Sequence, residues 1–261
     1  MQRYFVAAEQ FEGTSGVMLT GEDAFHAARV MRMKPGDRFI VSDGSSRTAI
    51  AVVREADSSL VRADIEELLE ADSEPLWSVT IAQSLPKGDK MELVIQKGTE
   101  IGAYAFIPFQ SKRMIVQYDA KKEAKRLERW SKIAKEAAEQ SHRGFVPSVR
   151  EVHGWRELVE AIPAYDLALF CYEREGHAAS GFGLGDAVRA YRAKRPDAVE
   201  GRLNVLLIVG PEGGFTEEEA DEAETAGAAI VGLGKRILRT ETAGIVGLTC
   251  LLYESGEMGG A

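Results

Sequence analysis

The sequence predicts an α/β protein in which a small antiparallel β domain precedes a larger domain with a mostly parallel sheet. From Trp77 onward, apolar runs of strand length alternate with segments of helical period. This alternation is typical of βαβ units, whose parallel sheets are covered by helices on both faces. Before Trp77 the runs are short and alternate between apolar and polar residues, as half-buried antiparallel strands do. The 261 residues suffice for one large or two modest domains.

The first domain is expected to hold three strands separated by Asp-Gly and Asp-Ser-Ser turns, at residues 38–44, 47–53 and 59–68. One helix interrupts them, with Thr20 as its N-cap and acidic residues in its first turn. The acidic, proline-containing segment 67–77 has the composition of a domain boundary. We therefore divide the chain into residues 1–72 and 73–261.

In the second domain, apolar runs predict strands at residues 78–85, 105–109, 166–170, 204–210 and 228–234. Helical periods predict helices at residues 90–102, 124–140 and 244–253. Residues 203–209 are almost continuously apolar, which indicates a strand buried on both faces.

Composition excludes several classes of protein. Hydrophobic residues make up 45% of the chain and charged residues 28%, as in ordinary globular proteins. The net charge of -9 means that any polyanion must be bound by a local group of cations. No apolar run is long enough to cross a membrane, and we expect a cytoplasmic protein. The four histidines are scattered and the two cysteines lie far apart, so we expect no metal site.

The strongest local motif is the glycine-rich turn GPEGGF at residues 210–215, between a predicted strand and a predicted helix. Thr216 is expected to cap that helix together with Glu219, three residues later. Glycines let backbone amides approach a ligand at the carboxyl end of a strand. A tight turn without any ligand explains the same residues. The turn matches neither a P-loop nor a dinucleotide-binding fingerprint.

A second loop, residues 231–239, also follows a strand and precedes a helix, with Thr240 as the expected N-cap. It carries the cations Lys235, Arg236 and Arg239 beside apolar Ile237 and Leu238. Together the two loops can form one pocket for a ligand with an apolar ring and a nearby anionic group. A solvent-exposed cationic turn is the alternative.

Two further groups of charges stand out. Lys97 and Glu100 are three residues apart on one helix, a spacing that usually gives only an exposed ion pair. The segment 121–144 has a cationic helical face opposite an apolar stripe. This face suits phosphate contacts, and it equally suits simple solvation because glutamates occur in the same helix.

Taken together, the motifs resemble the RsmE-type ribosomal RNA small-subunit methyltransferases over almost the whole chain. The resemblance rests on blocks in the family's order: residues 3–5 (RYF), 26–37, 97–102 (KGTEIG), 108–113 (PFQSKR), 137–147, 210–215 and 233–243 (LGKRILRTETA). Gly98 and Ile101 stand where the family often has Ala and Leu, and the segment 181–201 resembles a variable insertion.

The resemblance implies an N-terminal PUA-like β-barrel and a C-terminal SPOUT domain, with a deep trefoil knot at about residues 165–255. It implies a homodimer that uses S-adenosylmethionine to methylate N3 of a uridine in 16S ribosomal RNA within the small subunit. Three loops would line the cofactor; their expected contacts are Cys171, Tyr172, Glu173, Val209, Gly210, Pro211, Glu212, Gly213, Gly214, Leu233, Gly234, Arg236, Ile237, Leu238 and Arg239.

Removing the N3 proton of uridine requires a base or a group that stabilises negative charge on the uracil oxygens. Glu212 and Glu241 are the candidate bases. The candidate stabilising cations are Arg236, Arg239, Lys97 and Arg113. For RNA binding we expect a local track of cations: Arg3, Arg29, Arg32 and Lys34 of the first domain, with Arg113 and Arg143 of the larger one.

Two alternatives remain open from the sequence. The knot loops alone also fit a SPOUT methyltransferase that acts on another RNA site, such as a ribose 2'-hydroxyl of transfer RNA. The same fold also fits a catalytically silent RNA-binding factor of ribosome assembly.

Overall fold

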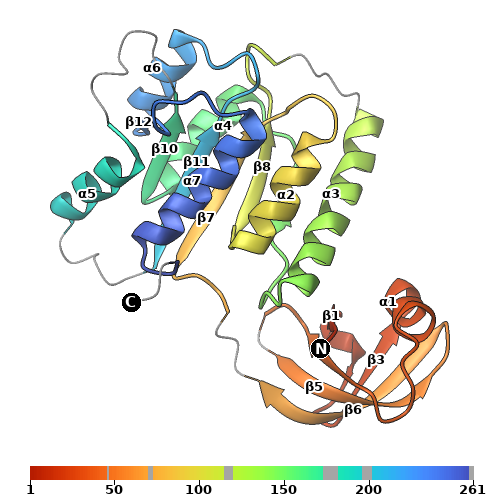
Figure 1. The fold of residues 1–261 in the computed structure, drawn as a ribbon. Helices are drawn as coiled ribbons and strands as arrows, with labels where there is room; N and C mark the ends of the chain where they lie inside the picture. Colours follow the sequence, from red (N-terminus) through yellow and green to blue (C-terminus); the bar gives the residue numbers. More distant parts are fainter. Residues whose placement is uncertain (46, 70–72, 115–119, 173–181, 196–201, 259–261) are drawn as a thin grey trace. The chain divides into compact units, whose positions relative to one another are not determined.

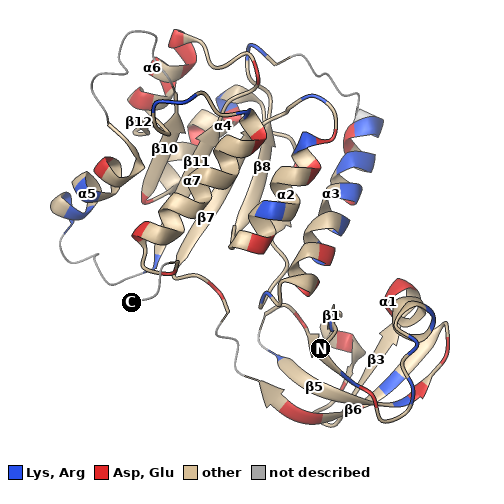
Figure 2. Ribbon diagram, in the orientation of Figure 1, with Lys and Arg blue, Asp and Glu red and all other residues tan. Residues whose placement is uncertain are grey.

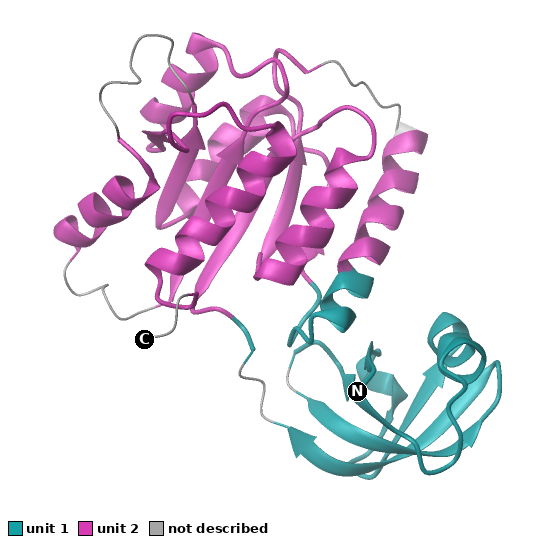
Figure 3. Ribbon diagram, in the orientation of Figure 1, with its two compact units in different colours: residues 1–74, 135–146 teal, residues 75–134, 147–261 magenta. Residues whose placement is uncertain are grey.

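The computed structural model describes residues 1–261 except 46, 70–72, 115–119, 173–181, 196–201 and 259–261. The chain divides into two compact units, drawn in Figure 3: residues 1–74 with 135–146, and residues 75–134 with 147–261. Helix α3 (Ala120–Gln140) contributes residues to both units. The sequence-based division at residue 72 places this helix entirely in the larger domain.

The first unit is built on a six-stranded sheet in the order β1-β4-β5-β6-β3-β2, in which only β1 and β4 pair in parallel. Its strands are β1 (Arg3–Phe5), β2 (Phe11–Glu12), β3 (Gly16–Thr20), β4 (Arg38–Ser42), β5 (Thr48–Ala56) and β6 (Leu60–Leu69). The side chains of Tyr4, Leu19 and Phe39 are buried in its core. The small antiparallel β unit expected from the sequence is confirmed.

Short helical segments interrupt this sheet: η1 (Ala8–Gln10), α1 (Gly21–Phe25) and η2 (His26–Val30). Thr20 is the N-cap residue of α1, as expected, although its side chain makes no capping hydrogen bond. Segment η2 is a π-turn, since the amide of Met31 donates to the carbonyl of His26 at 2.9 Å. The chain leaves the turn through Arg32, whose φ of 54° is unusual for a residue other than glycine.

The second unit contains a six-stranded sheet in the order β12-β10-β11-β7-β8-β9, with every neighbouring pair parallel. Its strands are β7 (Trp77–Ser84), β8 (Ala105–Phe109), β9 (Ser148–Val149), β10 (Leu167–Cys171), β11 (Leu203–Val209) and β12 (Ala229–Val231). Strand β11 is central and buried except at Asn204. The parallel sheet and its doubly buried strand are therefore as predicted.

Helices cover both faces of the second sheet, as Figure 1 shows. They are α2 (Lys90–Ile101), α3, α4 (Trp155–Ala161), η3 (Ile162–Ala164), α5 (Leu184–Lys194), α6 (Glu217–Thr225) and α7 (Thr240–Glu254). Helices α2 and α7 pack together on one face, and α4 and α6 share a core with the sheet on the other. Loops from the strand ends are thus held between two helical layers.

Two glycines let helices α2 and α7 pack closely against the sheet. A Cβ on Gly247 of α7 would lie 2.8 Å from Leu207 of β11. A Cβ on Gly98 of α2 would lie 2.7 Å from the ring of Phe106. The Phe106 ring fills the space that the methyl group of an alanine would need. This packing explains why Gly98 stands where the family described above often has alanine.

Among the described residues, no helix combines the length and the apolar character needed to cross a membrane. The trefoil knot expected at about residues 165–255 includes segments outside the described residues, 173–181 and 196–201. The knot therefore stays a prediction.

Candidate active site

The segments that follow the strands leave the second sheet at one edge, because all six strands run in the same direction. They include the loops after β7, β8, β10, β11 and β12. In open α/β sheets this carboxyl edge is where ligands bind. The two glycine-bearing loops of the sequence analysis, 210–216 and 232–239, both lie here.

Internal packing accounts for three glycines of the loop 210–216. A Cβ on Gly210 would lie 2.9 Å from the Phe215 ring, and one on Gly213 would lie 3.2 Å from the carbonyl oxygen of Arg113. Gly214 has a φ of +66°, which other residues rarely adopt. The loop is therefore a fixed turn that fits its neighbours, in addition to any role of these glycines toward a ligand.

An aromatic cluster anchors the end of this loop. Phe215 is 3% exposed, and its ring centroid lies 4.1 Å from that of Phe170 on β10. The rings of Phe109 and Trp155 lie 6.2 Å and 6.0 Å from it. These contacts tie the loop to the sheet and to α4.

A buried carboxylate joins this loop to the loop after β8. Glu219 is 0% exposed; its Oε2 accepts from the Thr216 amide at 2.8 Å and its Oε1 from the Lys112 amide at 2.8 Å. The Thr216 hydroxyl in turn accepts from the Glu219 amide at 3.1 Å, so the predicted capping box is confirmed. Arg113 donates to the Phe215 carbonyl at 3.2 Å. The two loops are thus locked together.

A second buried network joins the glycine-rich loop to the start of α7. The side-chain amide of Gln83, at the end of β7, donates to the Thr240 hydroxyl at 2.8 Å. That hydroxyl donates to the Gly210 carbonyl at 2.6 Å. Arg239 is the N-cap residue of α7, one position before the expected Thr240. Thr240 links loops instead of capping the helix.

Lys90 brings together the two carboxylates that the sequence analysis proposed as bases. Its Nζ lies 2.8 Å from Oε1 of Glu212 and 3.5 Å from Oε2 of Glu241. The first contact is a hydrogen bond, whereas the second is an ion pair without one. The backbone amide of Lys87 also donates to Glu212, at 3.1 Å. Three chain segments therefore converge on one charged cluster.

Electrostatics keeps Lys90 and Glu212 of this cluster ionised. The hydrogen bond to Glu212 raises the pKa of Lys90. Desolvation disfavours the charged form of Glu212, but the hydrogen bonds from Lys90 and from backbone amides outweigh it and lower the pKa of Glu212. The sequence analysis missed Lys90. A cation in the first turn of a helix, where the dipole disfavours positive charge, was the available signal.

Comparison with family models identifies both parts of the chain. Residues 72–252 match the RNA methyltransferase domain, and residues 19–66 match the RNA methyltransferase PUA domain. The chain belongs to this RNA methyltransferase family. The mixed α/β fold with a PUA-like first unit, expected from the resemblance, is therefore confirmed.

Individual members of the family agree closely. The chain is 40% identical over 257 residues to ribosomal RNA small subunit methyltransferase E of Bacillus subtilis, covering 98% of this chain and 97% of that protein. A crystal structure of ribosomal RNA small subunit methyltransferase E from Neisseria gonorrhoeae bound to S-adenosyl methionine has a TM-score of 0.82 and 30% identity, covering 97% of each chain. A methyltransferase from Legionella pneumophila with bound S-adenosylmethionine has a TM-score of 0.81 and 27% identity, again covering 97% of each chain.

The residues that the family resemblance assigns to the cofactor follow three neighbouring strands. Strand β10 lies between β11 and β12, so the segments after Cys171, Val209 and Val231 leave the sheet side by side. The Tyr172 amide donates to the Val231 carbonyl at 3.0 Å. Burial raises the pKa of the Cys171 thiol to about 12, so this thiol is neutral at pH 7. Glu173 lies outside the described residues.

The predicted catalytic residues do not all lie in the cluster around Lys90. Glu212 and Glu241 share Lys90, and Arg236 and Arg239 are exposed on the loop after β12. Lys97 instead pairs with Glu100 at 2.7 Å. It lies seven residues beyond Lys90 on α2, roughly 10 Å along the helix axis. Lys97 therefore lies in a helix ion pair outside the cluster, and its catalytic role stays a prediction.

Two of the cations predicted to contact RNA are buried. Arg3 is 8% exposed and donates to the Arg143 carbonyl. Arg143 is 3% exposed, belongs to the first unit and pairs with Glu74 at 2.6 Å. Neither residue is presented to solvent in this structure, so RNA contacts by Arg3 and Arg143 stay predictions without support from their burial.

The other predicted RNA contacts remain available to a ligand. Arg29, Arg32 and Lys34 are exposed around the π-turn of the first unit. Arg113 lies in the loop after β8, where it contacts the glycine-rich loop.

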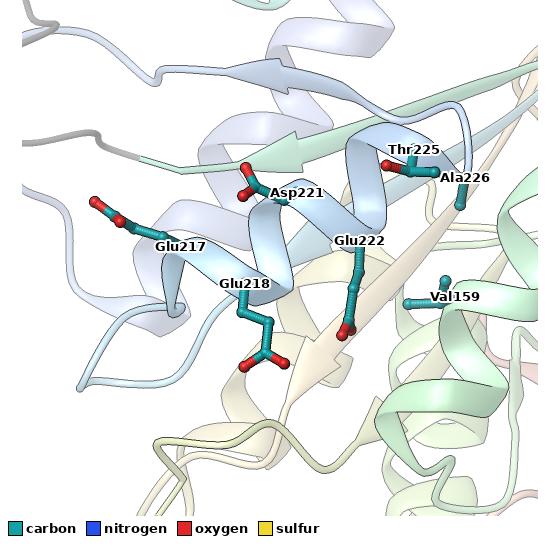
Figure 4. A pocket seen from close by; sticks show the side chains of 7 residues that line it. All are labelled: Val159, Glu217, Glu218, Asp221, Glu222, Thr225 and Ala226. Carbon is teal, nitrogen blue, oxygen red and sulfur yellow. The ribbon is translucent and has the colours of Figure 1, made fainter.

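An acidic hollow of about 620 Å³ lies between α4 and α6 (Figure 4). Its lining includes Val159, Glu217, Glu218, Asp221, Glu222, Thr225 and Ala226. Four carboxylates make it unsuitable for a polyanion such as RNA. No group of His, Cys, Asp or Glu side chains among the described residues is arranged to hold a metal ion.

Proposed function

We propose that this protein transfers the methyl group of S-adenosylmethionine to N3 of a uridine in 16S ribosomal RNA. Membership of the RNA methyltransferase family carries this proposal, together with 40% identity to a ribosomal RNA small subunit methyltransferase E. The substrate is proposed to be the RNA within an assembled small subunit, and the protein is proposed to act in the cytoplasm.

The loops at the carboxyl edge would hold the cofactor. Gly213 and Gly214 are exposed, so a ligand can approach the backbone at both residues, while the Gly214 amide itself donates to the Pro211 carbonyl at 2.9 Å within the turn. Ile237 is 86% exposed and Leu238 is half-buried, which suits an adenine ring laid against this loop. S-Adenosylmethionine, when bound, supplies a methyl group already activated by its positive sulfur. The chain's task is alignment and control of one proton.

The charged cluster suits that proton step. Uridine N3 must lose its proton to become a nucleophile, which places negative charge on the uracil ring. Glu212 and Glu241 are the proposed proton acceptors, and Arg236 and Arg239 the proposed stabilising cations. Because its pKa is lowered, Glu212 alone is a weak base. We therefore propose that cations, including Lys90, also favour loss of the N3 proton by stabilising the deprotonated uracil.

The active protein is proposed to be a homodimer. Helix α7 is apolar around most of its circumference, and Tyr253 near its end is 65% exposed. A helix of this kind is normally buried, and pairing across a two-fold axis would cover its outer face.

Nucleoside analysis of 16S RNA tests the function. A bacterial strain without the gene should lack one N3-methyluridine, and purified protein with S-adenosylmethionine should restore it on isolated small subunits. Methylation of a ribose, or no change in any nucleoside, would reject the proposed reaction. Failure to bind S-adenosylmethionine in calorimetry would indicate the catalytically silent alternative.

A further inference from the structure

The segment of α3 in the second unit concentrates positive charge in an acidic protein. Between residues 120 and 134 the chain has six Lys or Arg residues and two Glu, whereas its net charge is -9. Figure 2 shows the cations as a row along the helix. They are Lys121, Lys122, Lys125, Arg126, Arg129 and Lys132. We call this set the cationic face of α3.

The six cations share one side of the helix because their spacings combine steps of three and four residues with adjacent pairs. Trp130 and Ala134, on the opposite side, are fully buried. Five of the six cations are exposed, and Arg126 is half-buried. The cationic face therefore points away from the core and is about 17 Å long, from the rise of 1.5 Å per residue.

The spacing of these cations within α3 does not stabilise the start of the helix. Lys121 and Lys122 occupy its first turn, where the helix dipole disfavours positive charge. The helix also contains three like-charge pairs four residues apart, a spacing that destabilises a helix. They are Lys121 with Lys125, Lys122 with Arg126, and Lys125 with Arg129. A local rule that is broken repeatedly is expected where a side chain has a functional role.

Ion pairs within the protein neutralise only some of the cations on the cationic face of α3. Arg129 pairs with Glu92 of α2 at 2.6 Å, which also places α3 beside α2. Lys121 and Lys125 make no ion pair with any described residue of the chain. The charges of Lys121 and Lys125 are thus available to an external anion.

The topology places this charge near the candidate active site. Strand β8 ends at the carboxyl edge, and α3 connects it to its parallel neighbour β9. A helix in such a crossover starts near the carboxyl edge and runs back along the sheet. Lys121, Lys122 and Lys125 are therefore at the end of α3 that faces the edge holding Lys90 and Glu212.

We propose that the cationic face of α3 binds the sugar-phosphate backbone of the substrate RNA beside the site of methyl transfer. The inference rests on the proposed action on ribosomal RNA and gives the catalytic unit an RNA contact of its own, separate from Arg29, Arg32 and Lys34 of the first unit. Contacts made by the cationic face would not depend on the RNA sequence, because lysine and arginine can bind the phosphates of any sequence.

The test compares two double variants of the full-length protein. Lys121→Gln/Lys125→Gln removes two cations of the face while keeping good helix formers. Arg156→Gln/Arg189→Gln is the matched control, since both arginines are exposed in the same unit and pair within their own helices with Glu160 and Asp186. Binding to isolated small subunits is titrated at several salt concentrations, and S-adenosylmethionine binding is measured by calorimetry.

The face variant should lower the salt slope of RNA binding by about 1.5, from roughly 0.7 to 0.9 per lost phosphate contact. At 0.15 M salt this corresponds to an affinity loss of about 10- to 30-fold. Cofactor affinity should not change, and the control should match the parent protein. An unchanged slope in the face variant overturns the inference. If the parent protein itself binds no small subunits, the proposed function fails instead, and the two failures are distinguishable.

Discussion

Replacing Glu219 by alanine should unlock the two loops that frame the candidate site. The Glu219 carboxylate is fully buried and accepts hydrogen bonds from the amides of Lys112 and Thr216, each at 2.8 Å. Alanine keeps the helix but leaves both amides without their acceptor. The loops after β8 and β11 then lose their shared attachment.

The size of the effect follows from these two contacts. A hydrogen bond to a charged group contributes roughly 1.5 to 3 kcal/mol, so losing two should lower the free energy of unfolding by about 3 to 6 kcal/mol. Domains are stable by roughly 5 to 15 kcal/mol, so a domain in the middle of this range should remain folded at 25 °C. Glu219→Gln keeps the shape of the side chain but places its NH2 group against one of the two N–H donors. This change should lower the free energy of unfolding by about 1 to 2 kcal/mol.

Urea unfolding and calorimetric titration with S-adenosylmethionine together make the assay. Glu219→Ala should lower both the unfolding free energy and the cofactor affinity, the latter at least tenfold. Glu218→Ala is the control, because its side chain is 70% exposed and its ion pair with Lys112 should be worth less than about 1 kcal/mol. If Glu219→Ala matches the parent in both measurements, the buried carboxylate does not hold the loops.

Four further predictions concern the site and its surroundings. Lys90→Ala should lower kcat at least tenfold and shift the pH profile of kcat, because Glu212 loses the hydrogen bond that lowers its pKa; an unchanged profile would contradict a role in the proton step. Gly213→Val should abolish cofactor binding, since its Cβ would lie 3.2 Å from the Arg113 carbonyl and distort the loop; unchanged affinity in calorimetry would exclude this loop from the pocket. Arg29→Ala/Arg32→Ala should weaken binding to small subunits and lower its salt slope by about 1.5 without changing cofactor affinity, whereas a slope equal to the parent's would leave both arginines as solvated surface. Light scattering at micromolar concentration should report a dimer, and a stable monomer would count against the proposed assembly.

The sequence predicted most elements because their signals are local. The nearly continuous apolar run 203–209 indicated a strand covered on both sides, and it is β11 in the middle of the parallel sheet. The Thr216 and Glu219 pair was readable as a capping box from its spacing, and both hydrogen bonds of that box are present. The carboxyl-edge position of the glycine-rich loop followed from the order strand, loop, helix.

The sequence was a weaker guide where a residue's surroundings depend on partners distant in sequence. Arg3 and Arg143 have the charge expected of an RNA contact, but burial joins them to each other and to Glu74, which is 69 residues from Arg143. Lys97 has the same side chain as Lys90 and lies on the same helix, yet only Lys90 is close to Glu212. A spacing in the sequence cannot distinguish these cases.

The sequence by itself determined most of the longer strands and helices and the membership of an RNA methyltransferase family, because periodicity, capping residues and motif order are properties of neighbouring residues. The tertiary structure decided which charges meet. Lys90 stands 122 residues before Glu212 and 151 before Glu241, and it reaches both only because parallel strands deliver their following segments to one edge. Ion pairs and buried hydrogen bonds act over a few ångströms in space, so the fold, and not the spacing along the chain, selects their partners.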